Sequence, residues 1–318
     1  MQEQILQFLK EHDGYLSGEE ISHSLKMSRT AIWKYMQELR KVGYEIVAVP
    51  HLGYKIVSVP DKLFPWEIQF GLGTKVMGQK IVYEETLTST MDTAFELAVA
   101  GSPEGTLVCS ESQTHGRGRM GRTWISPKSK GIYLSLILRP KLPPMETAKL
   151  TLLTAVVVSE AIQKICGFEV QIKWPNDLLV GRKKLAGILT ELHADPDRVK
   201  FVVVGIGLNV NTQSHQLPPG STSLKLETGQ TWSRVSLIQE MLKEWEQWYS
   251  QFTRRGFEPI LKRWKELSVT LGRRVRVSDP SGVIEGEAKD IDTDGGLLIR
   301  LDSGLILKRM AGDVMWAQ

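Results

Sequence analysis

The chain has 318 residues, 42% of them hydrophobic, and a formal net charge of +4. A chain of this size can bury more than one core, so we expect two or three domains. The mild basic excess permits nucleic-acid contact without requiring it. Two cysteines, Cys109 and Cys166, give neither a disulfide framework nor a metal-ligand spacing. The N-terminus lacks a basic n-region, and the longest apolar run, residues 150–162, is too short to span a bilayer. We therefore expect a soluble, cytoplasmic protein.

Residues 1–62 are predicted to form a winged helix-turn-helix domain. Ser17-Gly-Glu-Glu20 has the pattern of a capping box that opens a short helix. Ser28 is a good N-cap for the next helix, which runs to about Val42 with apolar residues at helical spacing on one face. Two short strands around residues 50–53 complete the wing.

The outward face of the helix that begins after Ser28 predicts contact with DNA. In this motif the N-terminal part of the helix lies nearest the base edges of the major groove. The candidate DNA-binding residues on this face are Ser28, Arg29, Thr30, Trp33, Lys34 and Gln37. Residues 1–60 hold seven basic and seven acidic residues, so a protein-interaction module is the alternative. The local excess of cations favours DNA, bound by a dimer on two half-sites.

Residues 63–268 are predicted to form a central α/β domain with a mixed sheet, because short apolar segments alternate with helical ones. The polar segment 212–232 is long for a connection and predicts a mobile lid. From residue 269 to 318 the hydrophobic period falls to two, with glycine-containing turns, which predicts a small SH3-like β-barrel of five strands. The fold class is therefore α+β and multidomain.

The segment Gly116-Arg-Gly-Arg-Met-Gly-Arg122 is the strongest candidate for a ligand site. Glycine lets the backbone approach a ligand closely, and arginine supplies a planar fork of donors that matches phosphate or carboxylate. The segment lies between apolar stretches, unlike an RGG-type tail in low-complexity surroundings. A solvated basic loop is the other alternative. The composition favours a polyanionic ligand such as a nucleotide.

Three other places put polar residues beside apolar segments. Ser89 and Thr90 precede a helix, where hydroxyls cap the helix and free N–H groups can also meet a ligand. A proline ends a strand just before Asn176 and Asp177, although an Asx turn explains this pair equally well. Lys184 opens an apolar strand, where the alternative is a gatekeeper at a sheet edge.

These motifs occur in the order Gly116–Arg122 with Trp124, Lys173–Asp177, Lys184–Leu189 and Gly205–Asn209. In this order, and with the winged helix before it, the chain resembles the bifunctional BirA family, biotin–[acetyl-CoA-carboxylase] ligase and biotin operon repressor. The resemblance covers the whole chain. It implies that biotin and MgATP give biotinyl-5′-AMP and pyrophosphate, after which biotin passes to a lysine of a biotin carboxyl carrier domain. Mg²⁺ is then carried by the nucleotide, and no protein metal site is expected.

The resemblance also implies roles for individual residues. The catalytic residues implied are Lys184, bridging the biotin carboxylate and the α-phosphate, Asp177, orienting or deprotonating the acceptor lysine, and Arg119. The biotin-binding residues implied are Ser89, Thr90, Gln113, Arg117, Gly118, Arg119, Lys184 and Trp124. The adenylate-binding residues implied are Arg117, Arg119, Arg122, Asn176, Asn209 and Trp232, the last from the 212–232 lid. Biotinyl-AMP is further implied to favour a homodimer that binds operator DNA.

Three positions depart from the family pattern. Met120 stands where many members have another arginine, Met91 where some have asparagine, and Ala317 near the C-terminus where some end in arginine. Two alternatives stay open. A lipoate- or octanoate-protein ligase shares the adenylate chemistry, but the polar set Ser89, Thr90 and Gln113 suits a ureido ring better than an aliphatic tail. A ligand-sensing repressor without transferase activity would not need Asp177 and Lys184.

Overall fold

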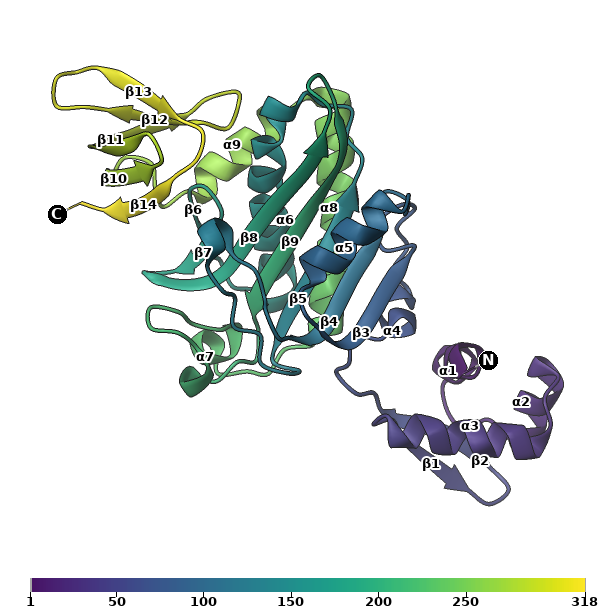
Figure 1. The fold of residues 1–318 in the computed structure, drawn as a ribbon. Helices are drawn as coiled ribbons and strands as arrows, with labels where there is room; N and C mark the ends of the chain where they lie inside the picture. The colour runs from purple at the N-terminus through teal and green to yellow at the C-terminus, as the bar shows by residue number, and fades with distance from the viewer. Residues whose placement is uncertain (1, 318) are drawn as a thin grey trace. The chain divides into compact units, whose positions relative to one another are not determined.

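The computed structural model describes residues 2–317 and divides into two compact units, Met1–Lys62 and Leu63–Gln318 (Figure 1). The first unit consists of α1 (Gln2–Glu11), α2 (Gly18–Leu25), α3 (Arg29–Lys41) and the hairpin β1 (Glu45–Val49) and β2 (Gly53–Ser58). This element order confirms the predicted winged helix-turn-helix.

Local sequence explains the helices of the first unit. Ser17 Oγ accepts the Glu20 N–H, and the Glu20 carboxylate accepts the Ser17 N–H, which confirms the predicted capping box. Ser28 Oγ accepts the N–H of Ala31 and starts α3. The apolar residues of α3 that share its inner face, Ile32, Met36 and Leu39, are buried.

A seven-stranded mixed sheet is the centre of the second unit. Its strands are β3 (Ile81–Leu87), β4 (Leu107–Gln113), β5 (Gly131–Leu138), β6 (Gln171–Lys173), β7 (Asp177–Val180), β8 (Lys183–Ala194) and β9 (Val199–Asn209). They lie in the order β3-β4-β5-β9-β8-β7-β6. Only β3 and β4 pair in parallel among these described strands, and the other neighbours are antiparallel. The prediction of a mixed sheet is confirmed.

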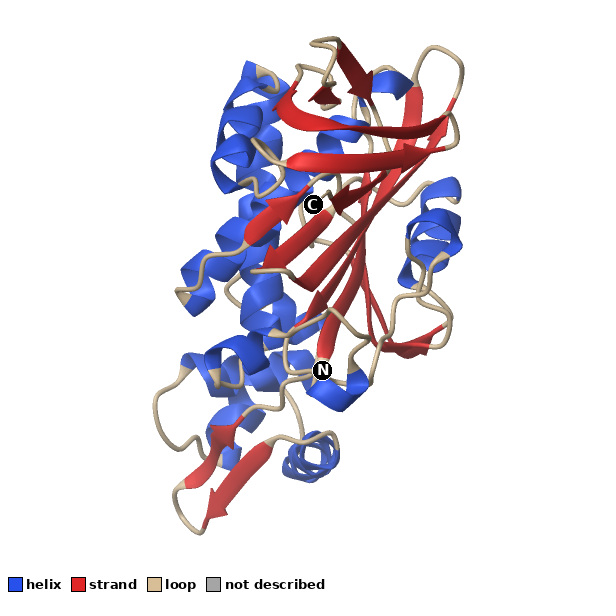
Figure 2. Cartoon of the chain, turned by 90° about the vertical axis from the view of Figure 1, so that its left-hand side faces the viewer, coloured by secondary structure: helices blue, strands red, loops and turns tan. Residues whose placement is uncertain are grey.

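Helices cover both faces of this sheet (Figure 2). One face packs on α6 (Ala148–Cys166), α8 (Arg234–Arg255) and α9 (Glu258–Leu267), and the other on α5 (Thr90–Val99). Successive strand residues point to opposite faces, so Val108 packs in the α5 core and Cys109 in the α6 core. A short helix, α4 (Pro65–Gln69), precedes the sheet.

The C-terminal strands form a separate antiparallel sheet. They are β10 (Arg274–Asp279), β11 (Gly282–Ile291), β12 (Leu297–Arg300), β13 (Ile306–Arg309) and β14 (Asp313–Trp316). Their order is β13-β12-β11-β10-β14. The five predicted strands of this small β unit are therefore present, arranged as an antiparallel sheet.

The segment 212–232, predicted to be a mobile lid, contains two short elements. It contains a 3-10 turn, η3 (Ser214–Gln216), and a short helix, α7 (Leu224–Thr228). Asn211 closes the segment, because its side chain accepts the Trp232 N–H at 3.0 Å and donates to the Trp232 carbonyl at 2.9 Å. Two further 3-10 turns are η1 (Arg119–Gly121) and η2 (Pro144–Glu146). Within residues 2–317, no helix has the length and apolar character needed to cross a membrane.

Candidate active site

The polar strand ends and the Gly116–Arg122 segment meet in one pocket on the central sheet. We call residues 114–130, which join β4 to β5, the arginine–glycine loop. Residues from this loop, β8 and β9 line the pocket, together with Asp313 of the C-terminal sheet. The sequence-predicted site residues that line it are Thr90, Gln113, Arg117, Gly118, Arg119, Arg122, Trp124, Asn176, Asp177, Lys184 and Asn209.

Two paired glycines form the floor of the pocket under Trp124. Gly187 of β8 and Gly207 of β9 are register partners. A Cβ on Gly207 would lie 2.4 Å from Trp124 Cε2, and one on Gly187 would lie 3.0 Å from Trp124 Cζ3. Only glycine therefore lets the indole lie against these strands. Trp124 Nε1 is buried without a hydrogen-bond partner in the described chain.

One end of the pocket is polar but uncharged. Gln113 Oε1 accepts the Thr90 N–H at 2.9 Å and the Thr90 hydroxyl at 3.2 Å. Gln113 Nε2 donates to Ser126 Oγ at 2.9 Å, and Ser135 donates to Thr90 Oγ1 at 2.9 Å. This network fixes the side chains before any ligand arrives.

The other end of the pocket is cationic. Arg119 Nη1 donates to Asn176 Oδ1 at 2.7 Å, and its guanidinium also approaches the Gly312 carbonyl at 3.4 and 3.5 Å. Arg122 Nη1 donates to Asp313 Oδ1 at 3.2 Å. The loop is thus attached to both the β6–β7 turn and the C-terminal sheet.

The Arg117 guanidinium faces carboxylates from two other elements. Its Nη1 donates to Asp92 of α5 at 2.7 Å, and its Nη2 pairs with Glu191 of β8. A phosphate contact by this side chain would have to replace these ion pairs. Arg117 is nevertheless one of the residues that line the pocket.

Lys184 lies between the two ends of the pocket. Its Nζ is 2.7 Å from Asp177 Oδ1 and 5.6 Å from the centroid of the Trp124 ring. Both members of the ion pair are partly exposed, so the pair can be reached by a ligand. A cation held over an aromatic face by one carboxylate is well placed to meet an incoming anion.

Burial changes the acidity of two cations in this region. It lowers the pKa of the Arg119 guanidinium, an effect that Asp313 and Asp177 oppose. Burial also lowers the pKa of the Lys173 ammonium; Asp177 opposes this shift, and the like charge of Lys184 adds to it. Lys173 Nζ lies 5.6 Å from the ring centroid of Trp316. In both groups, burial disfavours the charged form and a nearby carboxylate favours it.

Two predicted site residues lie outside the pocket lining. Ser89 is buried, and its Oγ accepts the N–H of Met91 as the N-cap of α5. Trp232 Nε1 donates to Thr228 Oγ1 at 2.9 Å, so its indole packs beside α7. Asn209, which does line the pocket, donates to the Thr222 carbonyl and attaches the 212–232 segment to β9.

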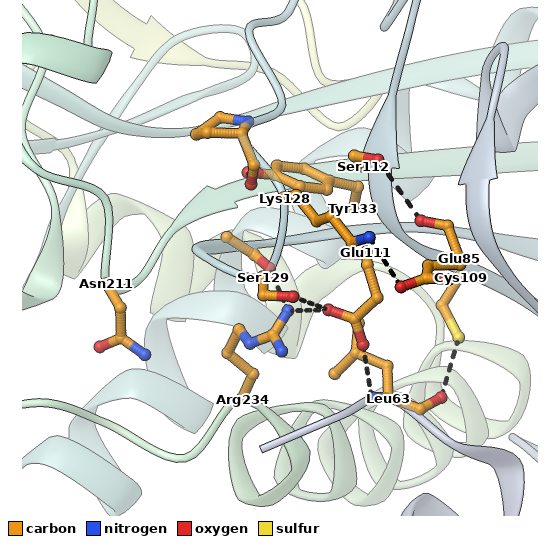
Figure 3. Close-up of polar contacts among 12 residues, drawn as sticks. Leu63, Glu85, Cys109, Glu111, Ser112, Lys128, Ser129, Tyr133, Asn211 and Arg234 are labelled. Carbon is orange, nitrogen blue, oxygen red and sulfur yellow. Dashed lines mark hydrogen bonds and ion pairs between the residues drawn. The ribbon is translucent and has the colours of Figure 1, made fainter. Parts of the chain in front are cut away.

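Sequence reasoning missed several residues that shape this region. The sequence alone does not point to Asp313 or to the glycines under Trp124, because their role is seen only once the strand register is known. A buried ion pair between Glu111 and Arg234 contacts Ser129, near the end of the arginine–glycine loop (Figure 3). These two residues are 123 positions apart in the chain, so no spacing rule could join them.

The six residues proposed to bind DNA extend from the N-cap of α3 into its second half. Ser28 caps the helix, and Arg29, Thr30, Trp33 and Lys34 are exposed while Gln37 is half-buried. Trp33 is 56% exposed. Arg29 pairs with Glu19 of α2 at 2.9 Å, with both side chains in solvent.

Comparison with known proteins agrees with this architecture. Residues 83–211 match the Biotin/lipoate A/B protein ligase family, residues 1–55 match an HTH domain, and residues 270–315 match the Biotin protein ligase C terminal domain. The biotin protein ligase from Aquifex aeolicus, solved with biotin and ATP, has a similar fold (TM-score 0.65, 28% identity, 76% of this chain and 99% of that chain). Fold and pocket thus place the central unit in the biotin/lipoate ligase class.

Two relatives extend the likeness across both units. The bifunctional ligase/repressor BirA of Bacillus spizizenii is 45% identical over 92% of this chain and 91% of its own. BirA of Escherichia coli is 32% identical over 94% of this chain and 92% of its own. The chain belongs to the family of bifunctional ligase/repressor BirA proteins.

Proposed function

We propose that this chain joins biotin to ATP as biotinyl-5′-AMP, transfers biotin to a lysine of a biotin carboxyl carrier domain, and acts as a DNA-binding repressor. Family membership and the likeness to a ligase solved with biotin and ATP support this function. One structural observation carries it: the pocket has a neutral polar end, a cationic end, and Lys184 between them.

In the first step a biotin carboxylate oxygen attacks the α-phosphorus of ATP. A phosphorus–oxygen bond forms, the bond to pyrophosphate breaks, and pyrophosphate leaves with the electron pair. The obstacle is the approach of two anions, which Lys184, Arg119 and Arg122 counter as charge-assisted donors, each contributing about 1.5–3 kcal/mol. Mg²⁺ enters on the nucleotide.

The neutral end of the pocket holds the biotin ring system in this proposal. A ureido group has both N–H donors and a carbonyl acceptor, which match the hydroxyl of Thr90 and the amide of Gln113. The Arg117 and Gly118 backbone and the Trp124 indole border the rest of the ligand. Ser89 supports Thr90 from behind, since it caps the same helix.

The cationic end holds the adenylate. Arg119 and Arg122 face the phosphate, and Asn176 and Asn209 lie nearest the adenine. Trp232 acts through the 212–232 segment, which Asn209 attaches to the pocket.

In the second step the amine of the acceptor lysine attacks the biotinyl carbonyl carbon, the carbon–oxygen bond to phosphate breaks, and AMP leaves. Deprotonating a lysine at neutral pH costs about 4 kcal/mol. Asp177 orients the incoming ammonium and draws its proton away. Its position 2.7 Å from Lys184 supports a role as a charged carboxylate that holds ammonium groups.

The repressor activity belongs to α3 of the first unit. In this proposal biotinyl-AMP favours a homodimer, and each copy places one α3 in the major groove of one half-site. Arg29 and Lys34 contact DNA, while Thr30, Trp33 and Gln37 face base edges. Retention of biotinyl-AMP by the protein would then signal that the supply of biotin is sufficient.

The test of the first step is exchange of label between pyrophosphate and ATP with biotin, lipoate or octanoate. We expect exchange with biotin only, reduced by about 100-fold in Arg119→Ala. Arg255→Ala, at the exposed end of α8, is the matched control and should behave as the parent. Exchange with lipoate or octanoate alone would reassign the acid substrate. No exchange with any acid would leave a ligand-sensing DNA-binding protein.

Two further assays follow the exchange assay. Label transfer from biotin to a purified carrier domain tests the second step. Gel shift of a duplex selected from random DNA, with and without biotin and ATP, tests the repressor. We expect Lys34→Ala to weaken the shift without changing pyrophosphate exchange.

A further inference from the structure

A fully buried ion pair stands outside the pocket and has no part in the proposed reaction. Arg234 Nη1 lies 2.7 Å from Glu111 Oε2, and neither side chain has any exposed surface. Taking two charges out of water is costly, so such a pair persists only where its hydrogen bonds are well satisfied. Figure 3 shows the carboxylate of Glu111 at the centre of these contacts.

The Glu111 carboxylate holds three separate segments of the chain. Its Oε1 accepts the Leu63 N–H at 2.9 Å, and its Oε2 accepts the Ser129 hydroxyl at 3.0 Å as well as Arg234. Arg234, at the start of α8, also donates to the Gly131 carbonyl at 3.2 Å. One carboxylate therefore joins the start of the second unit, the end of the arginine–glycine loop and the start of α8.

The contacts with Ser129 close the base of the arginine–glycine loop. The loop leaves β4 just after Gln113, two residues beyond Glu111, and Ser129 lies at its return. Ser129 has φ +59°, a left-handed conformation that a serine rarely adopts. Glu111 holds it there twice, because the Ser129 N–H donates to the Glu111 carbonyl at 3.0 Å and its hydroxyl to the carboxylate.

The contact with Leu63 holds the chain where it leaves the winged helix unit. Leu63 is the first residue of the second unit and is buried. Glu111 accepts its N–H, and the Cys109 thiol donates to its carbonyl, with sulfur and oxygen 3.7 Å apart. Burial raises the pKa of Cys109, so the thiol keeps its proton. Neighbouring residues of β4 thus fix both polar groups of the Leu63 backbone.

We propose that Glu111 is a positioning residue that couples the ligand loop to the linker of the DNA-binding unit. Through Ser129 it sets the base of the arginine–glycine loop, and through Leu63 it anchors the chain that follows residue 62. The inference rests on the proposed function, because it gives a route by which ordering of the arginine–glycine loop at the biotin site affects the winged helix unit. Glu111 touches no substrate and acts only through these partners.

The experiment uses the full chain and two variants. Ser129→Ala removes one hydroxyl and leaves the ion pair intact. The double variant Glu111→Leu/Arg234→Met removes both charges together, so that no buried charge is left unpaired. The control is Ser159→Ala, which removes a buried hydroxyl that donates to the Ala155 carbonyl within α6.

The first readout needs no ligand. Amide hydrogen exchange of residues 114–128 should be about tenfold faster in both variants, with residues 297–309 of the C-terminal sheet unchanged as an internal reference. Ser159→Ala should leave the loop unchanged. Unchanged loop exchange in the folded variants, or equal acceleration in the control, would overturn the positioning role.

The second readout separates binding from chemistry. In pyrophosphate exchange we expect the KM for biotin to rise about tenfold in both variants while kcat stays within about twofold. In gel shift with the selected duplex, the gain in DNA affinity from biotin and ATP should fall about tenfold in the double variant. A raised KM with an unaffected gain in DNA affinity would refute the coupling through Leu63.

The two readouts also separate this inference from the proposed function. If the parent chain shows no exchange with biotin, the proposed ligase activity fails, and the coupling that rests on it fails too. The hydrogen-exchange result would then still decide whether Glu111 holds the loop. A faster loop with an unchanged KM in an active enzyme would refute the role of Glu111 in ligand binding.

Discussion

The two ends of the pocket are organised in opposite ways. At the neutral end, Gln113 and Thr90 are satisfied by each other and by two serines, through hydrogen bonds of 2.9–3.2 Å. At the cationic end, Arg119 and Arg122 are satisfied by groups from distant segments, namely Asn176, the Gly312 carbonyl and Asp313.

This difference has a consequence for binding. The neutral end is held by hydrogen bonds between uncharged groups that lie 13 to 45 residues apart in the chain. At the cationic end, carbonyl and carboxylate oxygens occupy donors that a phosphate would take, so binding there must exchange one acceptor for another. We therefore expect substitutions at the neutral end to affect biotin, and those at the cationic end to affect ATP.

The largest effect is expected at the junction of the two ends. Lys184→Met removes the cation that faces both reacting anions, and we expect kcat/KM for exchange to fall about 100–1000-fold, or about 3–4 kcal/mol. The matched control is Lys183→Met, one position earlier on β8, where the exposed ammonium lies 3.6 Å from Glu227. Comparable losses in the two variants would show that the activity depends on positive charge on β8 in general, and not on the position of Lys184.

A smaller effect is expected at the neutral end. Gln113→Leu leaves the Thr90 N–H and Ser126 without their partner, so we expect the KM for biotin to rise about 30-fold and the free energy of unfolding to fall by about 1–3 kcal/mol. The KM for ATP should change by less than about twofold. Ser112→Ala, on the opposite face of β4, is the control. An equal rise in both KM values would break the distinction between the ends.

Much of the fold follows from local sequence. The capping box at Ser17, the apolar strand of residues 131–138 and the helix starting at Ser89 each carry a pattern that short-range physics explains. The segment 212–232 was harder, because a five-residue helix such as α7 leaves little periodicity in a polar sequence. Its order depends on Asn211 and Trp232, which are 21 residues apart.

The cationic residues of the pocket could be predicted from the sequence. The residues that hold them in place were harder to predict. Arginines between glycines indicate an anion site directly, and Lys184 and Asp177 lie at strand ends where ligands are met. The partners that hold them come from other elements, as Asp313 of β14 holds Arg122. Likewise, the local sequence does not distinguish Gly207 from any other strand glycine. Its position under Trp124 follows only from the strand register. Such contacts depend on tertiary structure.

The cationic end can be tested by removing a cation or its partner. Arg122→Ala should raise the KM for ATP about tenfold, since it removes a charge-assisted contact. Asp313→Asn should change the same KM by less than about threefold, because Arg122 is largely in solvent and surface ion pairs contribute little. Measuring both in pyrophosphate exchange decides whether Asp313 only occupies Arg122 or positions it. A loss in Asp313→Asn as large as that in Arg122→Ala would favour positioning.

The smallest effect expected is a pH dependence confined to the cationic end. Burial lowers the pKa of Lys173, against the attraction of Asp177, so this ammonium loses its proton at a lower pH than an exposed lysine. As pH rises, Lys173, which lies outside the pocket lining near Asp177, Asp313 and Arg122, therefore loses its charge, while Thr90 and Gln113 do not titrate. We expect the KM for ATP to rise about threefold at a pH below the ordinary lysine pKa of about 10.4, and the KM for biotin to stay constant.

Lys173→Arg isolates this titration, because arginine keeps its charge over the same range. The variant should lose the rise in the KM for ATP and otherwise follow the parent. If the rise persists in Lys173→Arg, another group titrates at the cationic end. If the KM for biotin rises in parallel in the parent, the two ends share their electrostatics, and the neutral hydrogen-bond network does not insulate the biotin site from charge changes near the phosphates.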